Sequence, residues 1–173
     1  MSGERLFFAL IPEPSLAERL HEQACTLKKY RDERIVKSDM VHMTLRYIGP
    51  VTLDIQDCVV KYVDMLNLPS FNVSIDKTGY WKIPKVTWCA PEKTTNNLKV
   101  LVEELEVICQ RCGIKAVKRP FKPHVTLLKN TKSLHEAPYQ VLHDWSVREF
   151  VLLASTSIDG GVEYRKIKSW SLG

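Results

Sequence analysis

The same order of features occurs twice in this chain, and that duplication constrains its fold more than anything else in the sequence. An apolar strand candidate at 6–11 precedes a helix with apolar residues at helical spacing, then a strand that begins His42-Met43-Thr44-Leu45. A second strand candidate at 86–90 precedes another amphipathic helix, then a strand that begins His124-Val125-Thr126-Leu127. The first strand and the histidine that follows it lie 36 positions apart in the first copy and 38 in the second. Such a repeat predicts two related halves that face each other.

The remaining segments predict how these halves are completed. A strand is expected at 71–75, and a C-terminal hairpin at 147–157 and 162–167 around Asp159-Gly160-Gly161. The aromatic segment 79–84 is interpreted as a connection between strands. Hairpins together with flanking helices predict an α+β fold with two pseudo-symmetric lobes of antiparallel-rich sheet around a central cleft. A chain of 173 residues fits a single domain, 1–173, built from both halves.

Each motif offers an imidazole and a hydroxyl together, because side chains two residues apart on a strand share a face. With five His, ten Thr and nineteen Leu in the chain, a His-x-Thr-Leu string is expected about 0.03 times by chance. An imidazole pKa of about 6.5 lets one histidine act as base and the other as acid near neutral pH. This suits in-line displacement at phosphorus, with the threonine hydroxyls donating to phosphoryl oxygens.

Charge along the chain favours a phosphate-bearing substrate. The net charge is +5, and residues 111–132 hold seven basic and no acidic side chains, which leaves 18 basic and 20 acidic residues elsewhere. A basic segment around His124 is interpreted as an attraction for anions. Neither motif places a second histidine or a carboxylate at ligand spacing, so neither a metal nor a cofactor is expected.

The cysteines and the hydropathy predict the environment of the protein. Five scattered cysteines, with no signal peptide, are expected to be free thiols, and Cys109 and Cys112 are interpreted as core residues of a helix. The apolar run 6–11 is too short to span a membrane. The sequence therefore predicts a cytoplasmic protein that does not bind membranes and, without apolar heptads, a monomer.

With these motifs in place, the chain resembles the 2H phosphoesterase superfamily, and most closely its RNA 2′,3′-cyclic phosphodiesterases, also known as 2′-5′ RNA ligases. The resemblance spans nearly the full length and rests on the opening segment 5–10, on both motifs, and on the flanks 48–49 and 119–123. It implies that His42 donates a proton to the leaving 3′-oxygen and that His124 accepts one from water. Thr44 and Thr126 would hold the phosphate. The implied substrate is RNA, or an oligonucleotide, that ends in a 2′,3′-cyclic phosphate, the product is a 2′-phosphomonoester, and the reverse chemistry would join 2′-5′ ends.

Four further side chains are candidates for substrate contacts. Many relatives carry arginine five positions after the second histidine, where this chain has Lys129, which keeps the charge and loses the bidentate fork. Strand alternation places Lys129 on the face opposite His124 unless the strand twists or bulges, and it places Arg46 on the face of His42 as a phosphate contact. Phe121 and Tyr47 are candidate base-stacking platforms beside the basic segment.

Two other functions stay open at this point. One is an RNA-binding module whose paired histidines only bind, which turnover would exclude. The other keeps the chemistry and changes the substrate to a small cyclic nucleotide or to a cyclic phosphate on ADP-ribose.

Overall fold

The structure, a computed structural model, describes residues 4–133 and 142–173. Its helices and strands follow one another as β1 (Arg5–Leu10), α1 (Pro14–Leu27), β2 (Arg34–Ile35), the 3-10 turn η1 (Ser38–Met40), β3 (Met43–Gly49), α2 (Leu53–Val63), β4 (Phe71–Ile75), β5 (Lys77–Trp81), β6 (Val86–Ala90), α3 (Asn96–Arg111), β7 (Val125–Lys129), β8 (His143–Val147), β9 (Glu149–Ile158) and β10 (Gly161–Ser171).

Local chemistry accounts for the two helices of the repeat. Pro14 begins α1. Its lack of an amide hydrogen costs nothing there, because the first amides of a helix have no acceptor within the helix. The apolar residues of α1 that recur at helical spacing are all buried. The Thr95 hydroxyl caps α3 by accepting a hydrogen bond from the Leu98 amide. Gly113, with φ at +82°, follows the end of α3 in the left-handed conformation that glycine adopts easily. Both helices therefore lie where the sequence predicts them.

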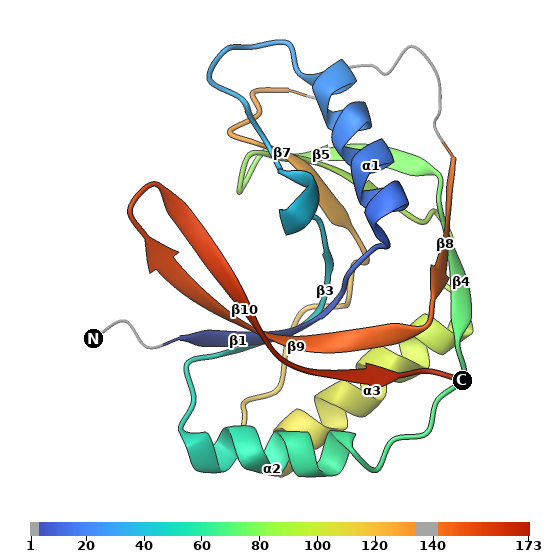
Figure 1. Ribbon diagram of the computed structural model, residues 1–173, viewed down its shortest axis with the longest axis vertical. Helices are drawn as coiled ribbons and strands as arrows, with labels where there is room; N and C mark the ends of the chain where they lie inside the picture. The colour runs from blue at the N-terminus through green and yellow to red at the C-terminus, as the bar shows by residue number, and fades with distance from the viewer. Residues whose placement is uncertain (1–3, 134–141) are drawn as a thin grey trace.

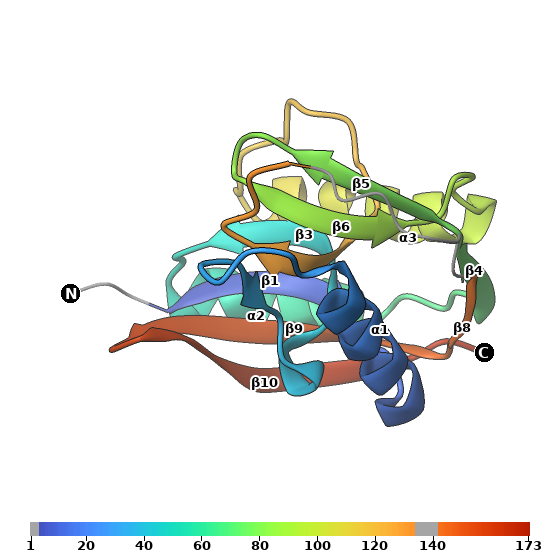
Figure 2. The same ribbon diagram turned by 90° about the horizontal axis from the view of Figure 1, so that it is seen from above.

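Eight of the strands in the described ranges form one antiparallel sheet in the order β10-β9-β1-β3-β7-β6-β5, with β2 paired to β7. Figure 2 shows β9 and β10 on one side of the molecule and β5 and β6 on the other, with β1 and β3 between them. The two motif strands, β3 and β7, are neighbours at the centre, and each is flanked by the first strand of its own half, β1 or β6. This arrangement confirms the predicted α+β fold with two pseudo-symmetric lobes.

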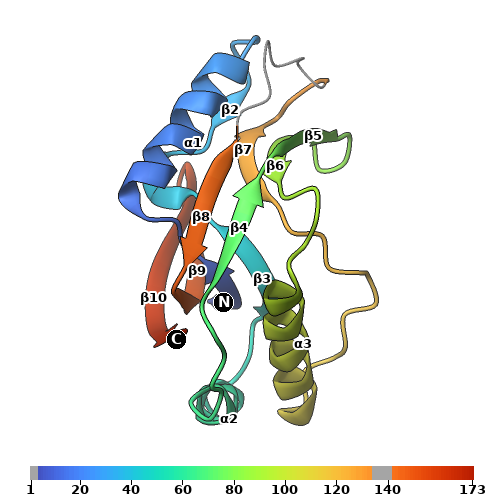
Figure 3. The ribbon, with the colours of Figure 1, turned by 90° about the vertical axis from the view of Figure 1, so that its right-hand side faces the viewer.

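The helices of the repeat pack across the two halves. Helix α1 contacts β7, and α3 contacts β3, so each helix supports the motif strand of the other half. In Figure 1, α2 and α3 lie together at one end of the molecule and α1 lies at the other. Strands β4 and β8 form a separate two-stranded ribbon, seen side by side in Figure 3. Within the described ranges, no helix is long and apolar enough to cross a membrane.

The interpretation of 79–84 as a connection is wrong for its first residues, because β5 extends to Trp81 and pairs with β6. Gly79 lies opposite Trp88 in that pair, and a Cβ atom added to it would be 2.2 Å from the Trp88 ring. A glycine within a strand permits such a close approach. Strand β8 was not predicted from the sequence.

The prediction of five free thiols is also wrong, because Cys58 and Cys112 form a disulfide between α2 and the end of α3. The packing of α2 against α3 brings the two Cα atoms to 5.9 Å although 54 positions separate them along the chain. Cys25, Cys89 and Cys109 are free. Burial raises the pKa of Cys89 to about 12 and that of Cys109 to about 11, so both remain thiols and behave as core residues.

Replacing Cys58 by alanine should lower the free energy of unfolding by about 3 kcal/mol, because the disulfide restricts the unfolded chain. Urea denaturation without reductant measures the loss. A reductant should destabilise the native sequence by a similar amount and leave the variant unchanged. Cys25→Ala, an exposed free thiol, is the control. Equal stability of native and Cys58→Ala proteins would show that this bond contributes nothing in solution.

Candidate active site

The two motifs meet at the pair that joins the lobes. Met43 of β3 lies opposite Val125 of β7 in antiparallel register. Continuing that register places His42 beside Thr126 and Thr44 beside His124, because residues one step before and one step after a pair face each other on antiparallel strands. The four polar side chains therefore share one face of the sheet, and each histidine lies next to the threonine of the other motif.

Both motif strands bulge at the leucine of the motif. In the pairing of β3 with β1, two consecutive residues of β1 lie opposite Thr44 and Arg46, so Leu45 is an extra residue of β3. In the pairing of β7 with β6, two consecutive residues of β6 lie opposite Thr126 and Leu128, so Leu127 is an extra residue of β7. A bulge adds one residue to a strand and so reverses the alternation of faces beyond it. These two bulges therefore determine which of the following side chains lie on the same face of the sheet as the histidines.

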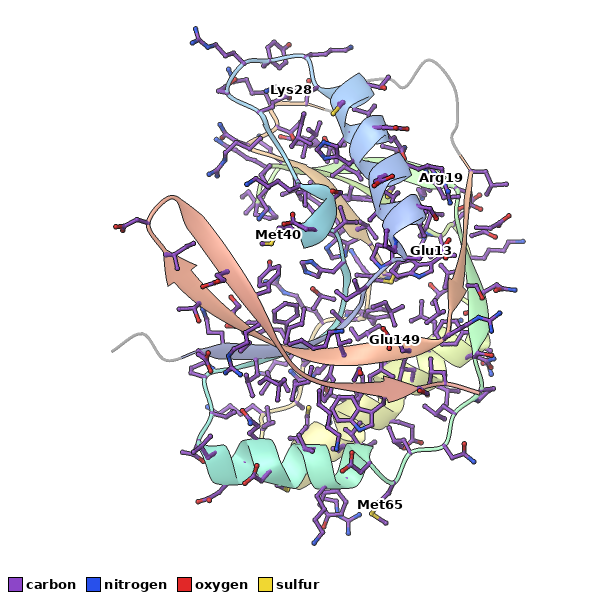
Figure 4. The ribbon with its side chains drawn as sticks, viewed as in Figure 1. Glu13, Arg19, Lys28, Met40, Met65 and Glu149 are labelled. Atoms are coloured by element: carbon purple, nitrogen blue, oxygen red, sulfur yellow. A yellow bond between two sulfur atoms is a disulfide. The ribbon has the colours of Figure 1, made fainter. Side chains whose placement is uncertain are left out.

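Both histidines are held in the same tautomer. Nδ1 of His42 donates to the Met40 carbonyl and Nδ1 of His124 donates to the Lys122 carbonyl, each at 2.8 Å. A carbonyl only accepts, so the hydrogen of a neutral ring sits on Nδ1 and the lone pair on Nε2. Met40 belongs to η1, the short turn that lies between α1 and the β9–β10 hairpin in Figure 4. In both motifs Nε2 is therefore the ring nitrogen that carries the lone pair and can exchange a proton.

The surroundings of the two rings lower both pKa values. Burial is the largest cause for His42, whose ring centroid lies 5.4 Å from that of Phe7 and 5.3 Å from that of Tyr164. The positive charges of Lys129 and His124 lower the His42 pKa further, while the Met40 hydrogen bond opposes the shift. Burial also lowers the pKa of His124, against the hydrogen bond to Lys122. Since the charge of His124 acts on His42, the two rings lie within electrostatic reach of each other.

Lys129 lies with the histidines and not on the opposite face. The extra residue Leu127 reverses the alternation, so Leu127 and Leu128 are both buried while Lys129 is exposed. Its charge acts on His42, as described above. The bulge in β7 therefore brings Lys129 to the face of His124.

The extra residue Leu45 reverses the alternation in β3 in the same way and turns Arg46 away from the face of the histidines. The prediction that Arg46 lies on the face of His42 is therefore wrong. Beyond the extra residue Leu45, the Arg46 side chain is buried and all its guanidinium nitrogens have protein partners. It pairs with Glu106 of α3, donates to the Tyr47 carbonyl, and donates to the Lys115 carbonyl at 2.8 Å. The structure thus supports a structural role for Arg46 in place of a phosphate contact.

Glu106 completes this connection to the segment before His124. Its carboxylate accepts from the Val117 amide at 3.0 Å and from Gln110 at 2.9 Å. Burial alone would raise the Glu106 pKa, but these hydrogen bonds and the Arg46 charge lower it. The Arg46–Glu106 pair therefore ties β3 and α3 to residues 115–117, from which the chain runs to His124.

A groove opens from the side of the site that holds Thr44 and His124. Its volume is about 710 Å³ and it runs past β5, α3 and the segment 117–122. Tyr47 and Phe121, the two predicted stacking residues, both line it, and Tyr47 is 53% exposed. Arg119 and Lys122 also line it and place positive charge there. Their roles as base platforms and anion contacts stay predictions.

Three aromatic residues beside the histidines were missed in the sequence. Trp81 lies edge-on to His124 with ring centroids 4.5 Å apart, and Phe7 and Tyr164 pack against His42. Burial raises the pKa of Tyr164. Gly79, a glycine within an aromatic segment, was the signal that could have identified the strand that carries Trp81.

In the part of the chain that the structure describes, no three side chains of His, Cys, Asp or Glu gather as a metal-binding group would. A site of two imidazoles and two hydroxyls instead offers two proton-transfer groups and two hydrogen-bond donors. This donor set, on a two-lobed antiparallel sheet, defines the class of two-histidine phosphoesterases.

Comparison with known proteins agrees with this class. The profile of the 2′-5′ RNA ligase superfamily matches residues 12–156, and the chain belongs to that family. It is 28% identical over 170 residues to the RNA 2′,3′-cyclic phosphodiesterase of Escherichia coli K12, covering 98% of this chain and 97% of the relative. The Aquifex aeolicus protein of the same name is 27% identical and covers 91% and 93% of the two chains. The crystal structure of E. coli LigT complexed with 3′-AMP matches with a TM-score of 0.90 at 27% identity over 98% of each chain.

Arg46→Lys should lower the free energy of unfolding by about 2 kcal/mol, because lysine cannot reproduce three directed hydrogen bonds at a buried site. Arg165→Lys is the matched control, since Arg165 pairs with Glu4 at 2.6 Å on the surface. That change should cost less than about 0.5 kcal/mol. Urea denaturation compares them, and equal losses would contradict the structural role of Arg46.

Proposed function

We propose that the protein hydrolyses the 2′,3′-cyclic phosphate ends of RNA to 2′-phosphomonoesters by acid/base catalysis between two histidines. The observation that carries this proposal is the antiparallel Met43–Val125 pair. Its register places His42, Thr44, His124 and Thr126 on one face of the sheet. Relatives over nearly the whole chain are named RNA 2′,3′-cyclic phosphodiesterases, which supplies the substrate class.

His124 is the general base and His42 the general acid. Nε2 of His124 takes a proton from water as the water oxygen attacks phosphorus, and Nε2 of His42 gives a proton to O3′ as the P–O3′ bond breaks. In each ring Nδ1–H donates a hydrogen bond to a backbone carbonyl oxygen. Neither ring can therefore rotate or change tautomer without losing that hydrogen bond. The scheme balances every proton without a metal ion.

Thr44 and Thr126 hold the phosphoryl group between the rings. Their hydroxyls donate to the non-bridging oxygens, where negative charge develops in the transition state. Lys129 adds a positive charge on the same side of the sheet. A bound phosphate anion also favours the protonated form of His42, which its surroundings disfavour in the free protein.

The substrate is the end of an RNA or oligonucleotide chain, favoured over a small cyclic nucleotide by the basic segment 111–132 around His124. A cytoplasmic location and a monomeric state stay predictions.

The direct test is incubation of the protein in chelator with a short RNA ending in a 2′,3′-cyclic phosphate. Phosphorus NMR should show a 2′-phosphomonoester. A parallel reaction with 2′,3′-cyclic AMP compares polymer and nucleotide through kcat/KM. Binding with no turnover would favour the non-catalytic RNA-binding module, and loss of activity in chelator would contradict the metal-free scheme.

His42→Ala and His124→Ala should each lower kcat by about 10²- to 10⁴-fold, because each removes one proton-transfer group. His21→Gln, a histidine of α1 outside both motifs, is the control and should leave kcat unchanged. Single-turnover rates with the cyclic-phosphate RNA measure the effect. Near-native activity in either alanine variant would exclude that histidine from proton transfer.

The pH dependence of kcat/KM should be bell-shaped, with its maximum below about pH 6.5, the ordinary histidine pKa. The free enzyme needs neutral His124 and protonated His42, and both pKa values are lowered. Lys129→Gln removes a charge that lowers the His42 pKa, so the alkaline limb should move to higher pH. An alkaline limb that moves to lower pH in this variant would contradict the placement of Lys129.

A further inference from the structure

Lys129 belongs to a row of side chains that crosses four strands. Trp81 of β5 lies opposite Val86 of β6, and Val86 lies opposite Lys129 of β7. On its other side, Lys129 lies opposite Arg34 of β2. Directly opposed residues of antiparallel strands point to the same face of a sheet. Because the Trp81 ring lies edge-on to His124 with centroids 4.5 Å apart, the whole row, including Arg34, lies on the face of the histidines.

The row ends on the side of the proposed acid. Strand β6 occupies one edge of β7, so β2 pairs with the other edge, the edge that also carries β3. Figure 3 shows β2, β7, β6 and β5 in this order at the end of the sheet where α1 lies. In the proposed in-line displacement O3′ leaves toward His42, which directly precedes β3, so the ribose that carries O3′ lies on that side. Lys129 and Arg34 therefore lie where the rest of the RNA strand approaches the site.

Two positive charges face each other at this end of the row. Arg34 and Lys129 are both exposed, and no Asp or Glu of the described ranges forms an ion pair with either. Like charges directly opposite each other destabilise an antiparallel pair. A bound anion removes that repulsion, and Arg34 offers it the bidentate fork that Lys129 lacks. The pair is therefore suited to phosphates.

The loop that carries Arg34 is fixed to the end of β7 by its own acidic residues. Residues 28–37 hold five basic and two acidic side chains. Asp32 pairs with Lys132 at 3.2 Å, and its carbonyl accepts from the Asn130 amide group at 3.2 Å. Glu33 is 1% exposed and accepts from two backbone amides of the loop, at 2.9 and 3.0 Å. Both carboxylates thus hold the loop in place, and Arg34 stays beside Lys129 with its charge available to a ligand.

We propose that Lys129 and Arg34 bind two successive phosphates of the RNA strand, and that Arg34 makes the protein prefer an RNA end to a 2′,3′-cyclic mononucleotide. This rests on the proposed function and names the residue that distinguishes the polymer. The charges that act on His42 are those of Lys129 and His124, and Arg34 is not one of them. Lys129 therefore contacts the cyclic phosphate, and Arg34, farther out, contacts the phosphodiester that precedes the terminal nucleotide. A mononucleotide has no such phosphodiester.

The experiment compares kcat/KM for three substrates. They are 2′,3′-cyclic AMP, an RNA dinucleotide that ends in a 2′,3′-cyclic phosphate, and the same dinucleotide with an uncharged methylphosphonate as its internal linkage. We expect the native protein to prefer the phosphodiester dinucleotide to the methylphosphonate dinucleotide by about tenfold, the effect of one hydrogen bond between charged groups. This comparison changes only the charge that Arg34 contacts.

Arg34→Gln should lower the ratio of kcat/KM for the phosphodiester dinucleotide to kcat/KM for 2′,3′-cyclic AMP by about tenfold. The variant should no longer distinguish the two dinucleotides. Arg34→Lys keeps the charge without the fork and should show a smaller loss. Arg148→Gln is the matched control, because Arg148 is an exposed arginine between β8 and β9, outside the row, and its ratio should equal that of the native protein.

Other results would overturn the proposal. An unchanged ratio in Arg34→Gln, or the same fall in the ratio for Arg148→Gln, would show that Arg34 does not select the polymer. Equal kcat/KM for the two dinucleotides with the native protein would show the same without any variant. Each of these results leaves the proposed function intact, whereas absence of turnover with all three substrates would overturn the proposed function and this proposal together.

Discussion

The antiparallel pair between Met43 and Val125 is the interaction on which the candidate site depends. It joins the two lobes, and its register alone decides that both histidines and both threonines share a face. A slip of one residue on either strand would turn that motif toward the core. The packing of α1 on β7 and of α3 on β3 opposes such a slip, because each helix holds the motif strand of the other half. The duplication therefore produces one site from two halves, neither of which contains both histidines.

The two bulges occur at equivalent positions of the two motif strands, but the residues that follow them differ, and this makes the two sides of the site chemically different. Past the extra residues Leu45 and Leu127, one strand presents Tyr47 and the other Lys129 to the site face. The charge of Lys129 acts on His42, the proposed acid, while Tyr47 lines the groove that begins at His124, the proposed base. The residues turned inward differ as well. Leu128 joins the core, and Arg46 ties α3 to the segment that leads to His124.

Much of the fold and site could be predicted because it is encoded locally. The strand and helix of each half, the C-terminal hairpin and the motif histidines all follow from periodicity, turn residues and recurrence within short windows. Predictions failed where they required distant contacts. Simple alternation misplaced Arg46, because a bulge is set by the partner strand, and the pairing of Cys58 with Cys112 depends on two helices meeting across 54 positions.

The sequence by itself determined which chemical groups the protein has and which local elements carry them: two imidazoles, each with a hydroxyl two residues later on a strand. Only the tertiary structure decided that each imidazole lies beside the hydroxyl of the other motif, that Lys129 joins them, that Arg46 does not, and that a groove begins at His124. The physical reason is that alternation and helical spacing act over a few residues, whereas register, bulges and cavities arise from the packing of segments far apart in the chain.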